Sequence, residues 1–364
     1  MIKHNTSYKI FSVVIFTLLI HFGAQSQTYT ELKRVKKSFK VNAATTVDIQ
    51  NKYGKIDVIP WDTDSVTISV SLSVHTDEVD QVGKIVENID FDFTGSQFYI
   101  NASTKFGNNY SSFLHDLKNI AESDHQMKID YTIKMPTYVN LIINNKYGDV
   151  FVDELKGNLS MNLQNGNFKA ENLSGNAQID IKFGYADIGA INIAKMDISY
   201  CELALKTAKQ LDLISKYSQI TIEHINLLKT NTKRDKFFIT TSDYVYGETY
   251  FSEIAIAELQ NEVSMDMKYG NLVIEQIKPT FTNINLSAKH TDIKLTFNSK
   301  ASFEVELTYE KADIETPESN TKLQNKQVEN MKGKYITFGK IGTGNTTGKL
   351  RVNAEGRSVI IQHK

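Results

Sequence analysis

The sequence predicts an all-β fold, a parallel β-solenoid with coils of about 17–23 residues. The first reason is a repeated turn. The stretch NNKYGDVFVDEL, Asn144–Leu155, is a near copy of NKYGKIDVIPW, which begins at Asn51. The second reason is composition, because 17 tyrosines beside many Val, Ile and Thr residues, with only four prolines, favour strands over helices.

Ten copies of the turn align on the glycine of KYG. From the second copy onward the steps are 18, 18, 17, 17, 29, 23, 21 and 19 residues, a period typical of stacked supersecondary units. The turn centres are Gly54, Gly148, Gly166, Gly184, Cys201, Ser218, Gly247, Gly270, Thr291 and Glu310.

The alignment has an aromatic column one residue before the turn centre. Around it, apolar residues alternate with period two, which is typical of strands with one buried face. Each copy is therefore predicted to be a strand, a glycine turn and a second strand. The aromatic column contains Tyr53, Tyr147, Phe183, Tyr200, Tyr217, Tyr246, Tyr269 and Tyr309, with Asn165 and His290 as exceptions.

Such units could form either an antiparallel meander or the coils of a solenoid. A meander gives no reason to repeat one side chain at one turn, whereas solenoid coils stack at roughly 4.8 Å and bring identical positions together. We therefore expect the glycine to supply a positive φ at a corner of each coil. The aromatic residue before it is expected to pack on its counterparts as a ladder.

Several other residues are explained by the same geometry. His290 is expected to be a ladder member, and Cys201 a small corner residue. Lysines before the aromatic column should form a solvated stripe: Lys52, Lys146, Lys182, Lys216, Lys268 and Lys289. An acidic stripe could hold calcium or flank a glycosidic bond, but Gly189 and Lys206 interrupt it, which favours a solvated face. Its members are Asp153, Glu171, Glu223, Glu275 and Glu315.

The first residues have the pattern of a secretory signal peptide. Lys3 and Lys9 precede the apolar run Ile10–Phe22, and GAQSQ then supplies small residues for cleavage before Gln27. A membrane anchor is the alternative, but this run is short against the roughly 20 residues that a bilayer span requires. The predicted organisation is a signal peptide at 1–26, with no transmembrane span after cleavage.

Three further regions are predicted after the signal peptide. Residues 27–143 form a capping region with the first repeat and two helical segments, at 76–89 and 111–123, whose apolar residues share one face. Residues 144–317 form the solenoid coils. Residues 318–364 form irregular C-terminal coils and a cap, with a turn at Gly356.

Composition and motifs exclude several function classes. Lys plus Arg total 41 against 42 for Asp plus Glu, so the basic excess that nucleic acid binding requires is missing. Cys201 is the only cysteine, so no intrachain disulfide is possible. The sequence has no HExxH, GxSxG, GxxxxGK or paired-cysteine motif, and its histidines are scattered. We therefore predict no catalytic, cofactor-binding or metal-binding residues.

The segment Ile129–Asn176 resembles a bacterial envelope family known as "putative adhesins" (head-GIN-like). The resemblance rests on an apolar strand, the proline of MP, and G-[DN]-[VF] coils separated by L-x-G, and it covers most of Val41–Ile361. It implies a right-handed, single-stranded β-helix in the periplasm or at the cell surface. The chain departs from this pattern between Ser218 and Gly247, where TNTKRDKFFITTSDY interrupts the regular coils.

Two function classes remain at this point. The first is an exported, non-enzymatic envelope protein whose long faces bind a polymer or a protein ligand, or act as a scaffold. The second is a carbohydrate-active, polysaccharide-cleaving enzyme, because elongated coils also suit polysaccharide chains. A groove with converging acidic and basic side chains would distinguish the enzyme from a uniform binding face.

The predicted signal peptide makes export directly testable. N-terminal sequencing of the protein from envelope fractions should give Gln27 as the first residue, because cleavage follows the small residues of GAQS. An intact Met1 on the envelope-associated protein would contradict this prediction.

Overall fold

The computed structural model describes residues 29–76, 83, 85–107, 126–329 and 331–364. Strands account for 78% of these residues and helices for 1%, and the strands are mostly parallel. Two compact units share the chain. Of the described residues, the first unit includes those within Met1–Lys33, Leu72–Asp90 and Phe106–Lys128. The second unit includes those within Arg34–Ser71, Phe91–Lys105 and Ile129–Lys364.

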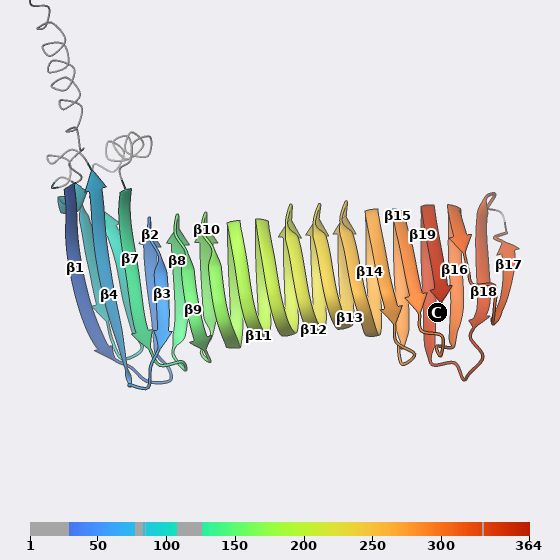
Figure 1. Ribbon diagram of the computed structural model, residues 1–364, viewed down its shortest axis with the longest axis horizontal. Coiled ribbons are helices and arrows are strands. Elements are labelled where there is room, and N and C mark those ends of the chain that lie inside the picture. The colour runs from blue at the N-terminus through green and yellow to red at the C-terminus, as the bar shows by residue number, and fades with distance from the viewer. Residues whose placement is uncertain (1–28, 77–82, 84, 108–125, 330) are drawn as a thin grey trace, which may run out of the picture. The chain divides into compact units, whose positions relative to one another are not determined.

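The second unit is a β-solenoid whose coils each contain two strands joined at a corner (Figure 1). In the central coils, strands pair in parallel with the equivalent strands of the neighbouring coils, as when Leu159 pairs with Leu141 on one side and Ala177 on the other. This confirms the predicted solenoid. The central strands are β8 (Asn140–Lys146), β9 (Val150–Leu155), β10 (Leu159–Gln164), β11 (Phe168–Lys216), β12 (Gln219–Lys233), β13 (Lys236–Tyr250), β14 (Glu253–Ile277) and β15 (Asn283–Phe297).

The first coil is followed in the stack by a coil that lies far from it in sequence. Strand β2 (Thr46–Lys52) pairs with both β6 (Tyr99–Phe106) and β8. Strand β3 (Ile56–Pro60) likewise pairs with β7 (Gln126–Met135) and β9. The repeat at Tyr53 therefore stacks directly on the repeat at Tyr147, despite the long segment between them.

The C-terminal strand is inserted within the stack rather than added at its end. Strand β19 (Gly348–His363) lies between β15 and β16 (Phe303–Glu315) and is parallel to both. Strands β18 (Lys334–Ile341) and β17 (Thr321–Gln327) then follow β16 in antiparallel pairing. A turn at Gly356 is confirmed, since this residue has a φ of 59° within β19.

The first unit includes parts of β1 (Tyr29–Lys40), β4 (Ser65–Thr76) and β5 (Ile89–Gly95). Within it, Lys33 Nζ donates to the Ile89 carbonyl at 3.0 Å. Of the predicted helix at 76–89, residues 83 and 85–87 are helical, and most of the remainder lies outside the described residues. The helix predicted at 111–123 and the signal peptide also lie outside them. No helix within the described ranges is long and apolar enough to cross a membrane.

The solenoid core consists of the inward-facing side chains, which are every second residue along each strand. In the coil around Phe183, Ile179 and Ile181 precede the corner and Ala186 and Ile188 follow it, all almost fully buried. Because every coil repeats this alternation, the buried side chains form continuous apolar columns between the two strands of each coil.

The corner conformation lies one residue earlier than the sequence suggested. Positive φ values occur at Tyr147 (59°), Phe183 (59°) and Tyr200 (56°), whereas the glycines that follow Tyr147 and Phe183 do not have positive φ. The expectation of a positive φ at Gly148 and Gly184 was therefore wrong. A left-handed residue with a Cβ is strained by about 1–2 kcal/mol, so the neighbouring coils must stabilise the ring in this conformation.

The corner glycines are required by close contact between coils. A Cβ on Gly148 would lie 2.0 Å from the carbonyl oxygen of Gly54, and a Cβ on Gly184 would lie 2.0 Å from that of Gly166. At this point the backbones of neighbouring coils are in direct contact, with no side chain between them. Gly54 likewise has no room for a side chain, since its Cβ would lie 2.1 Å from the Ile129 carbonyl oxygen.

Two of the ten predicted corners were wrong. Tyr246 and Gly247 lie within strand β13, where Gly247 pairs with Thr230 and Met265. The real corners of this region are at Arg234 (φ 59°) and Phe251 (φ 55°). They restore a regular step of 17 residues, since Gln219 pairs with Lys236 and Lys236 with Glu253.

The other incorrect corner is at the C-terminal end. Tyr309 and Glu310 lie in β16 before the corner, which is at Lys311 (φ 51°). Tyr309 stacks instead on Tyr335 of β18, with ring centroids 5.7 Å apart. The interruption predicted between Ser218 and Gly247 contains a regular corner, because Arg234 and Asp235 replace the usual aromatic residue and glycine. The stretch does contain one irregularity, a register shift against β14 between Ser242 and Tyr244.

Because neighbouring coils lie so close at the corners, the addition of a single methyl group to a corner glycine should reduce the stability of the protein. Gly184→Ala should lower the free energy of unfolding by about 1–3 kcal/mol, because the backbone of two coils must separate to admit the Cβ. Urea unfolding followed by circular dichroism would measure it. Gly344→Ala is the control, since its Cβ would meet no atom closer than 3.9 Å. Equal stability of both variants would contradict the close-contact explanation.

Candidate functional site

The outer face of the strands before the corner contains two adjoining hollows of about 800 and 570 Å³. Ser160, Gln178 and Lys195 line both, so we treat them as one polar groove. The groove runs across successive coils from Thr46 to Tyr246. Seven steps of roughly 4.8 Å give it a length of about 34 Å.

Amide and hydroxyl side chains line the N-terminal half of the polar groove. Two of the asparagines also connect neighbouring coils: Asn140 Oδ1 accepts from the Asn158 backbone at 2.9 Å, and Asn158 Oδ1 from the Asn176 backbone at 3.1 Å. The exposed side chains farther along the strands offer both donors and acceptors to a ligand. They are Asn144, Ser160, Asn162 and Gln178.

The middle of the polar groove contains charged side chains of both signs. The Asp180 carboxylate lies 3.5 Å from Lys182 Nζ, and Asp212 Oδ1 accepts from Gln210 Nε2 at 3.2 Å. Asp197, Lys195 and Lys229 complete this region. Neighbouring side chains thus hold two of the groove's carboxylates.

Two less polar residues lie toward the C-terminal end of the polar groove. Ile214 is 58% exposed and adds a branched aliphatic side chain to this polar face. Tyr246, predicted as a ladder residue, lies here instead. Its pKa is raised by burial, with a smaller contribution from its hydrogen bond to Glu262. The outward amide positions were visible in the sequence alternation, but the hollow itself was not.

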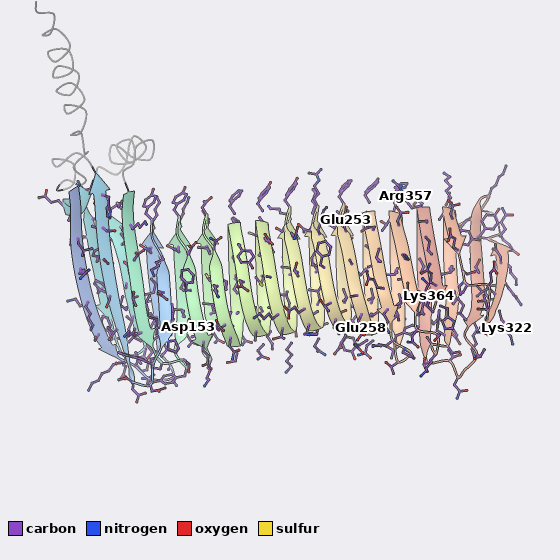
Figure 2. All side chains as sticks on the ribbon, viewed as in Figure 1. Asp153, Glu253, Glu258, Lys322, Arg357 and Lys364 are labelled. Atoms are coloured by element: carbon purple, nitrogen blue, oxygen red, sulfur yellow. The ribbon has the colours of Figure 1, made fainter. Side chains whose placement is uncertain are left out.

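The acidic stripe lies outside the polar groove. Asp153, Glu171, Glu223 and Glu275 are exposed on the strands after the corner, and none lines either hollow. Figure 2 shows Asp153 at the end of its strand opposite the corner, whereas Glu253 and Arg357 lie at the corner end. Among the described residues, no group of three or more His, Cys, Asp or Glu side chains could hold a metal ion.

The aromatic column forms a stack of exposed rings along the corner edge, which we call the corner ladder. Phe183 stacks on Tyr200 with centroids 5.1 Å apart, and Tyr200 on Tyr217 at 4.9 Å, with interplanar angles of 7° and 4°. The predicted sequence of contacts is confirmed here. Tyr53 stacks on Tyr147 at 5.4 Å in the same way.

The corner ladder continues beyond an arginine. The Arg234 guanidinium carbon lies 5.3 Å from the Tyr217 ring centroid and 5.6 Å from that of Phe251, so it occupies one step between two rings. Its Nη1 also donates to the Tyr217 hydroxyl. Phe251 then stacks on Tyr269 at 4.8 Å, and Tyr269 on His290 at 5.2 Å. His290 is therefore a ladder member, as expected.

Polar side chains fill the inside of the corner. Asn145 Nδ2 donates to the Gly54 and Gly148 carbonyls at 3.0 and 2.8 Å, which satisfies backbone acceptors where the coils touch. Cys201 is a buried corner residue, as predicted, and its thiol lies 3.2 Å from the Ser199 carbonyl oxygen. Burial raises the pKa of this thiol, which disfavours the reactive thiolate.

Asp235 occupies the same inner position and is only 1% exposed. Its Oδ1 accepts from the Ser218 backbone amide at 2.6 Å, and its Oδ2 accepts from the Ser215 hydroxyl at 2.8 Å. Burial raises the pKa of this carboxyl above its ordinary 3.8, and hydrogen bonds offset part of the effect. Those bonds come from Thr232, Ser218, Ser215 and Lys233.

A family profile matches residues 86–340, which include most of the solenoid. The chain belongs to the Toastrack DUF4097 family. Among curated proteins, none has a matching sequence. The repeated coils, the corner ladder and the polar groove are therefore features of one member of the Toastrack DUF4097 family.

Several solved structures resemble this Toastrack DUF4097 chain over most of their length. A "putative cell adhesion protein" from Clostridium sporogenes is 11% identical, with 92% of this chain and 100% of that chain covered and a TM-score of 0.21. A "putative adhesin" from Parabacteroides distasonis is 12% identical, with coverage of 72% and 94% and a TM-score of 0.34. A "putative adhesin" from Bacteroides fragilis is 12% identical, with coverage of 91% and 97% and a TM-score of 0.21.

The buried carboxyl predicts a pH dependence of stability. Because the folded state holds the Asp235 proton more tightly than the unfolded chain, the free energy of unfolding should fall as pH rises from 3.8 through the higher folded-state pKa. Asp235→Asn has no such proton and should lack this decline. Urea unfolding at a series of pH values would measure the difference.

Asp197→Asn is the matched control, since this carboxylate is exposed in the polar groove. Its stability should follow the wild-type pH dependence. If the free energy of unfolding changed with pH in the same way for the wild type and Asp235→Asn, Asp235 would not be the group that causes the decline.

Proposed function

We propose that the protein is an exported, non-enzymatic cell-envelope protein that binds an extended, hydroxyl-rich polymer along the polar groove. The observation that carries this proposal is the continuity of the groove across successive coils. A compact ligand would occupy one hollow, whereas a polymer can lie along the stack and contact side chains from each coil it crosses.

The chemistry of the groove favours a polysaccharide as this polymer. Its amides and hydroxyls each combine donor and acceptor groups, which complements the hydroxyls of sugars. The exposed Ile214 and the half-buried ring of Tyr246 add apolar surface beside these polar groups. Charged groups of both signs lie in the same groove, so it has no uniform charge that would select a strongly ionic ligand.

Binding without cleavage is supported by the state of the groove's carboxylates. A glycosidase needs one carboxyl group as acid and another as base or nucleophile, placed on either side of the scissile bond. Asp180 is instead paired with Lys182, and Asp212 accepts a hydrogen bond from Gln210. These contacts suit side chains that position a ligand. Export is supported by the predicted signal peptide at 1–26.

A bulky residue in the groove tests the proposal. The protein from Gln27 onward would be measured against isolated envelope polysaccharides by calorimetry. Ser160→Trp, at the position shared by both hollows, should weaken binding by about tenfold or more because the ring obstructs the groove. Thr221→Trp is the matched control on the exposed face of the strands after the corner, and it should bind as the wild type does.

Two outcomes would contradict the proposal. One is equal polysaccharide affinity in Ser160→Trp and the wild type. The other is shortening of the bound polysaccharide, seen by size-exclusion chromatography after incubation, which would instead establish the carbohydrate-active enzyme.

A further inference from the structure

The corner ladder is interrupted at Asn165. This residue has the same left-handed conformation as the aromatic ladder members, with a φ of 54°. Tyr147 donates its backbone N–H to Gln164, and Asn165 donates its own to Lys182, both at 2.9 Å. Tyr147, Asn165 and Phe183 therefore lie on three consecutive coils, with an amide at the middle position.

The interruption leaves one side of each neighbouring ring without an aromatic neighbour at that step. Tyr147 stacks on Tyr53, and Phe183 stacks on Tyr200, but each faces the short Asn165 side chain on its other side. The two rings are 43% and 53% exposed. Two coil steps place them about 10 Å apart, which is the separation of two rings that enclose a third planar group.

The corner ladder itself shows that a planar group fits such a step. Arg234 occupies the position between Tyr217 and Phe251, and its guanidinium lies 5.3 and 5.6 Å from the two ring centroids. These rings are also two coils apart, because Gln219 pairs with Lys236 and Lys236 with Glu253. A flat group of similar thickness can therefore enter the Asn165 step from solvent.

Charge decides which planar group is favoured. The ammonium of Lys146 lies 5.0 Å from the Tyr147 ring centroid. Lys182 occupies the equivalent position on the Phe183 coil, since both lysines align with Gln164, but its Nζ lies 3.5 Å from the Asp180 carboxylate. The Lys146 ammonium disfavours a guanidinium at this step and favours an electron-rich ring or a ring beside a carboxylate.

We propose that the step between Tyr147 and Phe183 is a binding site for an aromatic ring that carries or adjoins an anionic group. The ring enters the stack beside Asn165, and its negative group lies toward Lys146. The site lies on the corner edge, outside the polar groove, so it does not depend on polymer binding there.

Saturation-transfer NMR with 4-hydroxyphenylacetate tests this site on the protein from Gln27 onward. Cyclohexylacetate is the matched probe, because it has a similar size and charge but a saturated ring. Only the aromatic probe should receive saturation. Asn165→Tyr should weaken its binding by about tenfold or more, because the new ring stacks on Tyr147 and Phe183 and fills the step.

Two further variants make the result specific. Arg234→Tyr replaces one planar group with another at a step already filled, so it should leave binding unchanged. Phe183→Leu keeps an apolar side chain but removes one ring face, so it should weaken binding even if Asn165→Tyr fails to fold. Equal binding of cyclohexylacetate, no binding of either probe, unchanged binding in Phe183→Leu, or equal loss in Arg234→Tyr would each overturn the proposal.

Discussion

The structure depends on parallel backbone hydrogen bonding between coils, which brings each position next to its counterpart one coil away. At the corner this contact is tightest, because the carbonyl of one turn lies where the next residue would place a Cβ, as Gly184 shows against Gly166. The glycine column follows from that distance. The aromatic column follows too, since a left-handed residue before each glycine directs its side chain toward the same position on the next coil.

The corner also shows how the fold tolerates exceptions to glycine. Cys201 and Asp235 place polar atoms inside the corner, where backbone and hydroxyl groups bond to them. Asn145 serves the same purpose from the neighbouring strand, since its amide donates to two corner carbonyls. Buried polar groups are stable only when they are hydrogen-bonded, so the identity of these residues is set by the local need for donors and acceptors.

The same regularity makes surface features possible that no single coil could form. The polar groove exists because outward side chains from successive coils line one continuous hollow, and its composition changes from amides to charges to Tyr246 while the backbone repeats. The corner ladder is a second continuous surface, with Arg234 and Asn165 at two of its steps. In such a fold the outward positions can carry function, because the core packing that restricts the inward residues does not restrict the outward ones.

The repeat, the strand alternation and most of the corners could be predicted from the amino-acid pattern, because inward positions have the same buried environment in every coil and keep the same chemical character. Tyr147, Phe183, Tyr200 and Tyr217 could be placed in one column from spacing alone. The residue with positive φ could not be predicted in this way, because contacts with the neighbouring coils fix that conformation. The tertiary structure also showed that Arg234 with Asp235 forms a corner while Tyr246 with Gly247 does not, since the Arg234 guanidinium lies between the rings of Tyr217 and Phe251. The insertion of β19 between β15 and β16 and the hollow of the polar groove likewise depend on contacts between distant segments, for which local residue patterns contain no signal.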